Sequence, residues 1–220
     1  MRWPRALAAL APLIALPWCA GAPAGAAPPT AGFRPEALRF KVQWPYDLPE
    51  HDRYREEHGA YFFILHNDDK PFARGNRTKP RVEMRFPDYR SGAQEYEADL
   101  YVPAGTAGTC VMQIHTGDAE ERSYGATTFM LFVEPDGGGS LHFYSQPREL
   151  ASGVWNRWFH LNVIHDVATH LVSCYIDGRL VFQKRDQDAG DYYMKTGLYA
   201  QHGATAVMQV AIRNLHFWSR

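Results

Sequence analysis

Apolar and polar residues alternate over short segments of this chain, and signals for tight turns separate the segments. Side chains of a β-strand point alternately to its two faces, so this pattern predicts strands with one buried face. The predicted strands are Val82–Phe86, Tyr96–Val102, Cys110–His115, Thr127–Val133, Leu141–Tyr144, His160–His165, Leu171–Ile176 and Val207–Ile212. Glycine adopts positive φ angles without steric cost, so hairpin turns are predicted at Asp136–Gly139 and at Asp177-Gly178. Many short strands without a three-turn amphipathic helix predict an all-β sandwich.

The first 26 residues have the pattern of a signal peptide. Arg2 and Arg5 give the segment a positive start, residues 6–18 are apolar and contain two prolines, and Ala-x-Ala patterns occupy residues 22–26. The apolar run is too short to span a bilayer. We therefore expect an exported protein, secreted or periplasmic and not bound to a membrane, whose mature part is a single domain at residues 27–220.

Composition and charge narrow the classes of function. Hydrophobic residues make up 45% and charged residues 21% of the 220 positions, which is typical of a globular protein and not of a disordered chain. Lys and Arg number 23 against 24 Asp and Glu, and removal of residues 1–26 with their two arginines leaves 21 against 24. A mature charge of −3 lacks the basic excess that a nucleic-acid binder needs, so we expect no nucleic-acid partner.

Two cysteines, Cys110 and Cys174, remain in the mature chain. An exported protein can join them in a disulfide, and two buried thiols fit the sequence equally well. The histidines show no spacing typical of a zinc site, so we predict neither a metal nor a cofactor.

Three of the predicted strands place chemically versatile side chains on one face. The predicted polar face carries Arg81, Glu83, Arg85, Gln113, His115, Tyr193, Lys195, Tyr199 and Gln201, and the predicted core face carries Val82, Met84, Phe86, Cys110, Met112 and Ile114. Alternation usually indicates no more than a solvated face. Solvated faces, however, carry Lys, Glu, Ser and Thr more often than Gln, His and Tyr. The three strands together therefore favour a ligand-binding groove on the concave side of a curved sheet.

These segments resemble the motifs of polysaccharide lyase family 7, whose members are alginate lyases: R-x-E-L-R, Q-I-H and Y-F-K-x-G-x-Y-x-Q, in the same order. The corresponding segments here are Arg81-Val-Glu-Met-Arg85, Gln113-Ile-His115 and Tyr193-Met-Lys-Thr-Gly-Leu-Tyr-Ala-Gln201. Residues 78–81, 162–166 and 175–178 are similar to the glucuronan lyases of polysaccharide lyase family 20 and to plant citrate-binding proteins. The resemblance covers about residues 40–220 and implies a β-jelly-roll sandwich of two antiparallel sheets with a concave substrate groove. The departures from the motifs, at Met84, Met194 and Thr196, fall on the predicted core face.

The resemblance implies cleavage of a 4-linked polyuronate, glucuronan or alginate, by β-elimination. This reaction removes the proton at C5 beside the carboxylate, and the developing negative charge needs oriented donors. Arg81 and Gln113 are predicted to supply these donors, with Glu83 orienting Arg81. His115 is the natural base near neutral pH.

Tyr199 is predicted to donate a proton to the departing O4, with the neighbouring Lys195 lowering the pKa of its hydroxyl. In mannuronate and glucuronate, H5 and O4 lie on the same side of the ring. Tyr199 can therefore also serve as the base, with His115 in support. The residues predicted to bind substrate are Glu83, Arg85, Tyr193, Lys195 and Gln201.

A non-catalytic binder of carboxylates or acidic glycans is the alternative that the citrate-binding resemblance leaves open. Such a binder needs Arg81 and Gln113 but has no need of both His115 and Tyr199, so their joint presence favours the lyase. In both cases we expect a monomer whose partner is anionic, and for the lyase this partner is an anionic polysaccharide.

Overall fold

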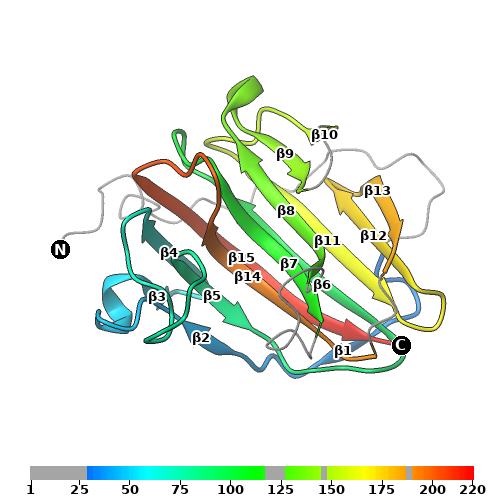
Figure 1. Cartoon of the computed structure of the whole chain (residues 1–220). Helices are drawn as coiled ribbons and strands as arrows, with labels where there is room; N and C mark the ends of the chain where they lie inside the picture. The colour runs from blue at the N-terminus through cyan, green and yellow to red at the C-terminus, as the bar shows by residue number, and fades with distance from the viewer. Residues whose placement is uncertain (1–28, 117–126, 145–147, 187–189) are drawn as a thin grey trace.

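The computed structural model describes residues 29–116, 127–144, 148–186 and 190–220, so the predicted signal peptide at residues 1–26 lies outside the described residues. Two sheets pack face to face (Figure 1). Their strands are β1 (Arg34–Glu36), β2 (Lys41–Gln43), β3 (Tyr54–Glu57), β4 (Ala60–His66), β5 (Arg81–Arg85), β6 (Ala93–Tyr101), β7 (Thr109–Thr116), β8 (Thr127–Glu134), β9 (Ser140–Phe143), β10 (Glu149–Ala151), β11 (Trp158–Asp166), β12 (Leu171–Ile176), β13 (Arg179–Arg185), β14 (Tyr192–Ala200) and β15 (Val207–Ser219). Two 3-10 turns, η1 (Glu50–Asp52) and η2 (Asp136–Gly138), complete the described elements. None of the described residues forms a helix long and apolar enough to cross a membrane.

The eight-stranded sheet has the order β13-β12-β11-β6-β15-β4-β3, and β1 pairs with β15. The seven-stranded sheet has the order β10-β9-β8-β7-β14-β5-β2. Every pair of neighbouring strands in the two sheets is antiparallel. The predicted architecture, a β-jelly-roll sandwich of two antiparallel sheets, is confirmed.

All eight predicted strands are present. Leu171–Ile176 has the predicted bounds, whereas the strand predicted at Val207–Ile212 extends to Ser219. The predicted turn at Asp136–Gly139 connects β8 with β9, and Asp177-Gly178 connects β12 with β13 at φ angles of 51° and 74°.

The core between the sheets is built from the apolar positions of alternating strands. Met84, Met194 and Thr196, which depart from the lyase motifs, are fully buried there. The Thr196 hydroxyl donates a hydrogen bond of 2.9 Å to the carbonyl of Val111 and lies 3.0 Å from the Tyr96 hydroxyl. These departures therefore change core packing and leave the opposite face of the sheet unaltered.

Irregular register in β7 and β14 interrupts the simple alternation. β14 shifts against β7 between Thr196 and Tyr199, and β7 shifts against β8 between Cys110 and Met112. An extra residue in a strand moves the neighbouring side chains to other positions on the sheet. The prediction that Cys110 faces the core is therefore wrong, because Cys110 lies opposite Tyr199 and near Glu83, and burial together with the Glu83 charge raises its pKa. Cys110 and Cys174 are both free and buried.

Candidate active site

The outward face of the seven-stranded sheet, which is turned away from the eight-stranded sheet, gathers most of the predicted site residues; we call it the site face. The three strands that carry the predicted residues are neighbours in the order β7-β14-β5. Arg81 lies opposite Tyr199, and Lys195 lies opposite both Arg85 and Gln113. Residues opposite each other on neighbouring strands share a face. The site face carries Arg81, Glu83, Arg85, Gln113, His115, Tyr193, Lys195 and Tyr199.

Glu83 lies at the centre of the site face and is only 1% exposed. Its Oε1 accepts a hydrogen bond of 2.6 Å from Gln113 Nε2, and its Oε2 accepts one of 3.3 Å from Arg81 Nη1. Lys195 Nζ lies 3.8 Å from the same Oε2. Arg81, Gln113 and Lys195 are themselves buried. One buried carboxylate therefore fixes three side chains that can donate to a ligand, and Glu83 orients Gln113 as well as Arg81.

The strand between Glu83 and Gln113 carries a glycine, Gly197. It lies on β14 directly opposite Glu83, between the strands that carry Glu83 and Gln113. The hydrogen bond between the Glu83 and Gln113 side chains spans this position of β14. A Cβ atom at this position would lie 2.4 Å from the carbonyl oxygen of Val82, and the φ angle of +136° disfavours any other residue.

The guanidinium of Arg81 lies between two aromatic rings. Its Cζ is 3.9 Å from the centroid of the Tyr199 ring and 5.2 Å from that of Phe72. Its Nη1 donates to Glu83, whereas its Nε is buried and has no hydrogen-bond partner in the described part of the chain. A guanidinium presents five N–H donors in a fixed fork. Arg81 therefore retains donors for a carboxylate of a ligand.

His115 stacks on Tyr193, with ring centroids 5.0 Å apart and an interplanar angle of 17°. His115 Nδ1 lies 2.9 Å from the carbonyl oxygen of Thr116, so Nδ1 carries the hydrogen and Nε2 is left as a proton acceptor. Burial, reinforced by the cations Lys195, Arg81 and Arg85, lowers the pKa of His115 to about 4. The imidazole is therefore neutral at pH 7.

Tyr193 is a proton donor, whereas His115 is a proton acceptor. Burial raises its pKa, and Arg85, whose Cζ is 4.0 Å from the centroid of the Tyr193 ring, counteracts part of the increase. Tyr193 is therefore protonated at neutral pH and able to donate. A neutral acceptor and a protonated donor stand side by side, which is the arrangement that acid–base catalysis requires.

Tyr199 lies away from this pair. It follows Tyr193 by six residues on β14, which is roughly 20 Å of extended strand at about 3.3 Å per residue. Burial raises the pKa of Tyr199, and the cation that opposes the increase is Arg81. The sequence predicted that Lys195 would lower this pKa, but the cation that lowers it is Arg81. The Gln201 amide, just beyond the end of β14, donates a hydrogen bond of 3.4 Å to the carbonyl of Tyr199.

Lys195 points instead toward Gln43 on β2, the edge strand. Its Nζ donates a hydrogen bond of 2.8 Å to Gln43 Oε1 and lies 5.5 Å from the centroid of the Tyr193 ring. Burial lowers the pKa of Lys195 to about 8, and Glu83 opposes this effect. Neither Gln43 nor Phe72 was identified from sequence. Gln43 belongs to a three-residue strand, and Phe72 lies outside any strand, so neither carried a pattern that pointed to the site.

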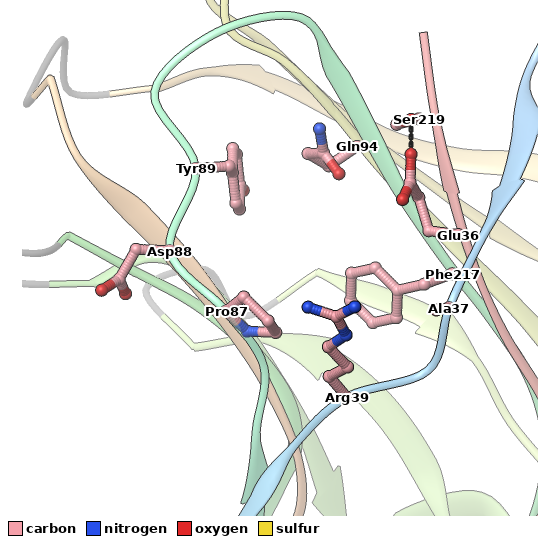
Figure 2. Close-up of a pocket in the computed structure, with 9 residues that line it drawn as sticks. All are labelled: Glu36, Ala37, Arg39, Pro87, Asp88, Tyr89, Gln94, Phe217 and Ser219. Atoms are coloured by element: carbon pink, nitrogen blue, oxygen red, sulfur yellow. Dashed lines mark hydrogen bonds between the residues drawn. The ribbon is translucent and has the colours of Figure 1, made fainter.

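A cavity of about 390 Å³ lies elsewhere, between the segment that follows β1, the connection from β5 to β6 and the end of β15 (Figure 2). Its lining residues are Glu36, Ala37, Arg39, Pro87, Asp88, Tyr89, Gln94, Phe217 and Ser219. Glu36 accepts a hydrogen bond from Ser219 there, and none of the predicted site residues lines the cavity. In the described ranges, no group of three or more His, Cys, Asp and Glu side chains is placed to hold a metal ion.

Comparisons with known proteins identify a family and related folds. The sequence model of a family described as alginate lyase matches residues 37–217. The chain is 33% identical over 198 residues to a citrate-binding protein of Hevea brasiliensis, a match that covers 87% of this chain and 79% of that protein. The fold is similar to that of alginate lyase AlgAT5 from polysaccharide lyase family 7, with a TM-score of 0.63 and 16% identity over 82% of this chain and 94% of that chain. The alginate lyase from Corynebacterium sp. gives a TM-score of 0.60 and 15% identity over 76% of this chain and 81% of that chain.

Proposed function

The chain belongs to the alginate lyase family, and from this premise we propose that it is a polysaccharide lyase that cleaves a 4-linked polyuronate, glucuronan or alginate, by β-elimination. The charge of the site face supports the proposal, because Arg81, Arg85 and Lys195 all lie there. A local cluster of cations attracts an anionic polymer even when the whole protein is weakly negative. A polyuronate carries one carboxylate on every sugar and complements this cluster.

Arg81 and Gln113 bind the carboxylate of the sugar at which the chain is cleaved. When the proton at C5 leaves, negative charge moves onto the carboxylate oxygens. Donors that are oriented in advance therefore stabilise the transition state more than the bound substrate. Glu83 acts as a positioning residue, because it holds both donors.

His115 and Tyr193 carry out the two proton transfers. Nε2 of His115 takes the proton from C5, and the electron pair of the C5–H bond forms the C4=C5 double bond. The bond from C4 to O4 breaks, and the Tyr193 hydroxyl gives its proton to O4. The chain ends are a 4,5-unsaturated uronate and a free hydroxyl, and the protein returns to its starting state when the imidazolium proton replaces that of Tyr193.

The parallel stacking of His115 and Tyr193 at 5.0 Å is the observation that carries this assignment. The two parallel rings come from neighbouring strands and lie on one face of the sheet. A sugar bound on that face therefore meets both rings with the same side of its own ring. Mannuronate and glucuronate have H5 and O4 on the same side of the ring, so we propose glucuronan and mannuronate-rich alginate as substrates. Tyr199, the proton donor expected from sequence, is proposed to hold the guanidinium of Arg81.

A pair of matched variants tests which tyrosine is the proton donor. Tyr193→Phe removes one oxygen, and we expect formation of unsaturated uronate to fall about 10²–10⁴-fold. Affinity for an intact oligouronate is expected to change much less, because the lost interaction acts mainly in the transition state. Tyr199→Phe keeps its ring against Arg81 and is expected to lose less than about tenfold. The reverse order of effects would return the donor role to Tyr199.

The second candidate function is non-catalytic binding of carboxylates or acidic glycans on the same site face. The similarity to the citrate-binding protein of Hevea brasiliensis favours it. A binder uses Arg81 and Gln113 in the same way but forms no unsaturated uronate. Calorimetry with citrate and with oligouronates, run beside the product assay, separates the two. Binding without product from any polyuronate would establish the second candidate.

We also propose that residues 1–26 direct export to the periplasm or medium and that the mature chain is a monomer. Mass spectrometry of the exported protein should find a chain that begins near residue 27. Light scattering should give the mass of one such chain. Retention of residues 1–26, or a dimer mass, would contradict the corresponding part of the proposal.

A further inference from the structure

The site face continues beyond the proposed catalytic strands onto β8 and β9. Met130 lies opposite Gln113 and Phe132 lies opposite Cys110, so both side chains share the site face. Tyr144 follows β9, and its N–H donates a hydrogen bond of 3.2 Å to the carbonyl of Met130. The Tyr144 and Phe132 rings lie 6.0 Å apart between centroids. The site face therefore ends in an aromatic pair.

The two halves of the site face differ in charge. One row of positions across the sheet contains three cations, which are Lys41, Arg85 and Lys195 on β2, β5 and β14. The same row continues past Gln113 to Met130 on β8. Strands β8, β9 and β10 contain no Lys or Arg, and their charged residues are Glu134 and Glu149. One half attracts carboxylates, whereas the other half offers aromatic rings and two carboxylates.

The spacing of the strands relates these halves to successive sugars. Neighbouring strands lie about 4.8 Å apart, so β9 lies roughly 10 Å beyond β7, which carries Gln113. A pyranose residue in a 4-linked chain advances by a distance close to one strand spacing. A glycan that lies across the strands, with its cleaved uronate over Gln113, therefore has its second following residue over Tyr144.

Tyr144 is available for such a contact, since it is 44% exposed, and Phe132 is partly exposed. Aromatic rings in binding sites stack on the apolar face of a sugar and need no charge on it. β8 and β9 place no Lys or Arg side chain beside these rings, and Lys184 of β13 instead donates a hydrogen bond of 2.9 Å to the carbonyl of Thr128 and lies 5.2 Å from the centroid of the core residue Phe143. The chemistry of this half fits an uncharged sugar.

We propose that Phe132 and Tyr144 form a subsite for an uncharged sugar residue, two residues from the uronate that loses its C5 proton. The inference rests on the proposed function, because it takes the bond to be cleaved above Gln113 and His115. It assigns a substrate class: a polyuronate in which neutral or esterified sugars occur among the uronates. The cationic half then selects the uronates on the other side of the cleaved bond.

Synthetic uronate hexasaccharides test the proposal. One has six free carboxylates, and two others carry a single methyl ester two residues from the uronate that loses its C5 proton, which is either the second residue before or the third residue after the central bond. We expect one of the two esters to lower KM about 3- to 10-fold relative to the fully charged compound, with kcat unchanged. The other ester should raise KM, because it removes a charge from the cationic half.

Substitutions test whether Phe132 and Tyr144 cause the preference for the ester. Tyr144→Ala and Phe132→Ala should abolish the preference for the ester, whereas Tyr144→Phe, which keeps the ring, should retain it. Tyr175→Ala, on the eight-stranded sheet, is the matched control and should behave as the wild type. Equal or weaker use of both esters by the wild type would overturn the proposal, as would a preference that survives Tyr144→Ala in a variant that melts at the wild-type temperature.

Calorimetry distinguishes failure of the proposed lyase function from failure of the proposed subsite. If the wild type forms no product from any hexasaccharide, calorimetry on the same three compounds still measures the subsite. Tighter binding of one ester, lost in Tyr144→Ala, would support the subsite on a non-catalytic binder. Tightest binding of the fully charged compound would overturn it.

Discussion

Two partly exposed histidines, one on each sheet, show how the surroundings of an imidazole decide what it can do. His115 shares the site face with Lys195, Arg81 and Arg85, and burial together with these charges lowers its pKa to about 4. His160, on the outward face of the eight-stranded sheet, is held between two carboxylates. Its Nδ1 lies 2.8 Å from Asp99 Oδ1, and its Nε2 lies 3.1 Å from Glu97 Oε1.

His160 is positively charged at neutral pH, whereas His115 is neutral. Burial alone would lower the pKa of His160, but its hydrogen bonds to Asp99 and Glu97 raise it to about 9. Both ring nitrogens of His160 are engaged by carboxylates, so this residue is a cation that stabilises the sheet. His115 is neutral and has Nε2 in position to accept a proton. Of these two described histidines, His115 is the one that stands beside a proton donor and shares its face with cations that can bind a carboxylate.

Among the variants that test this comparison of the two faces, Arg81→Ala is expected to lower turnover the most. Arg81→Ala removes the donors for the substrate carboxylate and leaves the buried Glu83 with fewer partners, so turnover should fall about 10²–10³-fold or more. Steady-state formation of unsaturated uronate measures the effect. Arg213→Ala, on the opposite sheet, is the control and should retain turnover. An Arg81→Ala enzyme with near wild-type activity would remove the guanidinium from the mechanism.

Glu83→Gln removes the carboxylate at the centre of the site face and tests whether it positions Arg81 and Gln113. Glutamine replaces one of the two acceptor oxygens by an NH2 donor, so Arg81 and Gln113 can no longer donate to separate oxygens as they do with Glu83. Misplacement of these donors should lower kcat roughly 10- to 100-fold. Glu83 also raises the pKa of Lys195.

The pH profile distinguishes this positioning role from a loss of folded protein. The wild-type profile should rise through about pH 4, where His115 becomes neutral, and fall above about pH 8, where Lys195 loses its charge. The alkaline limb should move to lower pH in Glu83→Gln. An alkaline limb that stays in place would show that Glu83 does not act on Lys195.

His160→Gln is expected to change stability and not activity. The folded pKa of about 9 exceeds the ordinary value of 6.5, so the stabilisation is fully present below pH 6.5 and is lost as the pH rises through 9. The variant should therefore be less stable at pH 6 by on the order of 1–3 kcal/mol and nearly equal to the wild type at pH 10. Urea unfolding at the two pH values measures this, and a difference that is independent of pH would contradict it.

Glu95→Gln should give the smallest effect, with the opposite sign. Glu95 is fully buried beside His160, and burial raises its pKa to about 7, although a hydrogen bond of 2.8 Å from Asn162 opposes the increase. Stability linked to Glu95 is therefore present below pH 4.5 and lost as the pH rises through 7. The amide avoids this loss, so the variant should be more stable than the wild type at pH 8 by about 1–2 kcal/mol and similar at pH 4. Lower stability of the variant at pH 8 would refute this account.

Local alternation was sufficient to predict the polar face of β5. This strand has no irregularity in its pairing with β14, so Arg81, Glu83 and Arg85 face outward as the sequence indicates. The tyrosine partner of His115 could not be predicted in this way. It depends on the register between β7 and β14, which shifts between Thr196 and Tyr199, and no single strand encodes that register.

Strand β4 was missed for a different reason. Its sequence is almost continuously apolar, without alternation, because both of its faces are covered. Phe63 and Leu65 belong to the main core, whereas Phe62 packs with Ala211 in a separate cluster on the other side of the sheet. A short apolar run without polar alternation does not by itself identify a strand.

The most direct test of the central claim is the ultraviolet absorbance of unsaturated uronate formed from glucuronan, mannuronate-rich alginate and guluronate-rich alginate. The account predicts that the wild type forms this product from glucuronan or from mannuronate-rich alginate, faster than from guluronate-rich alginate, and that Tyr193→Phe forms it at least about 10²-fold more slowly. A wild-type protein that binds these polymers but forms no unsaturated product from any of them would contradict the account.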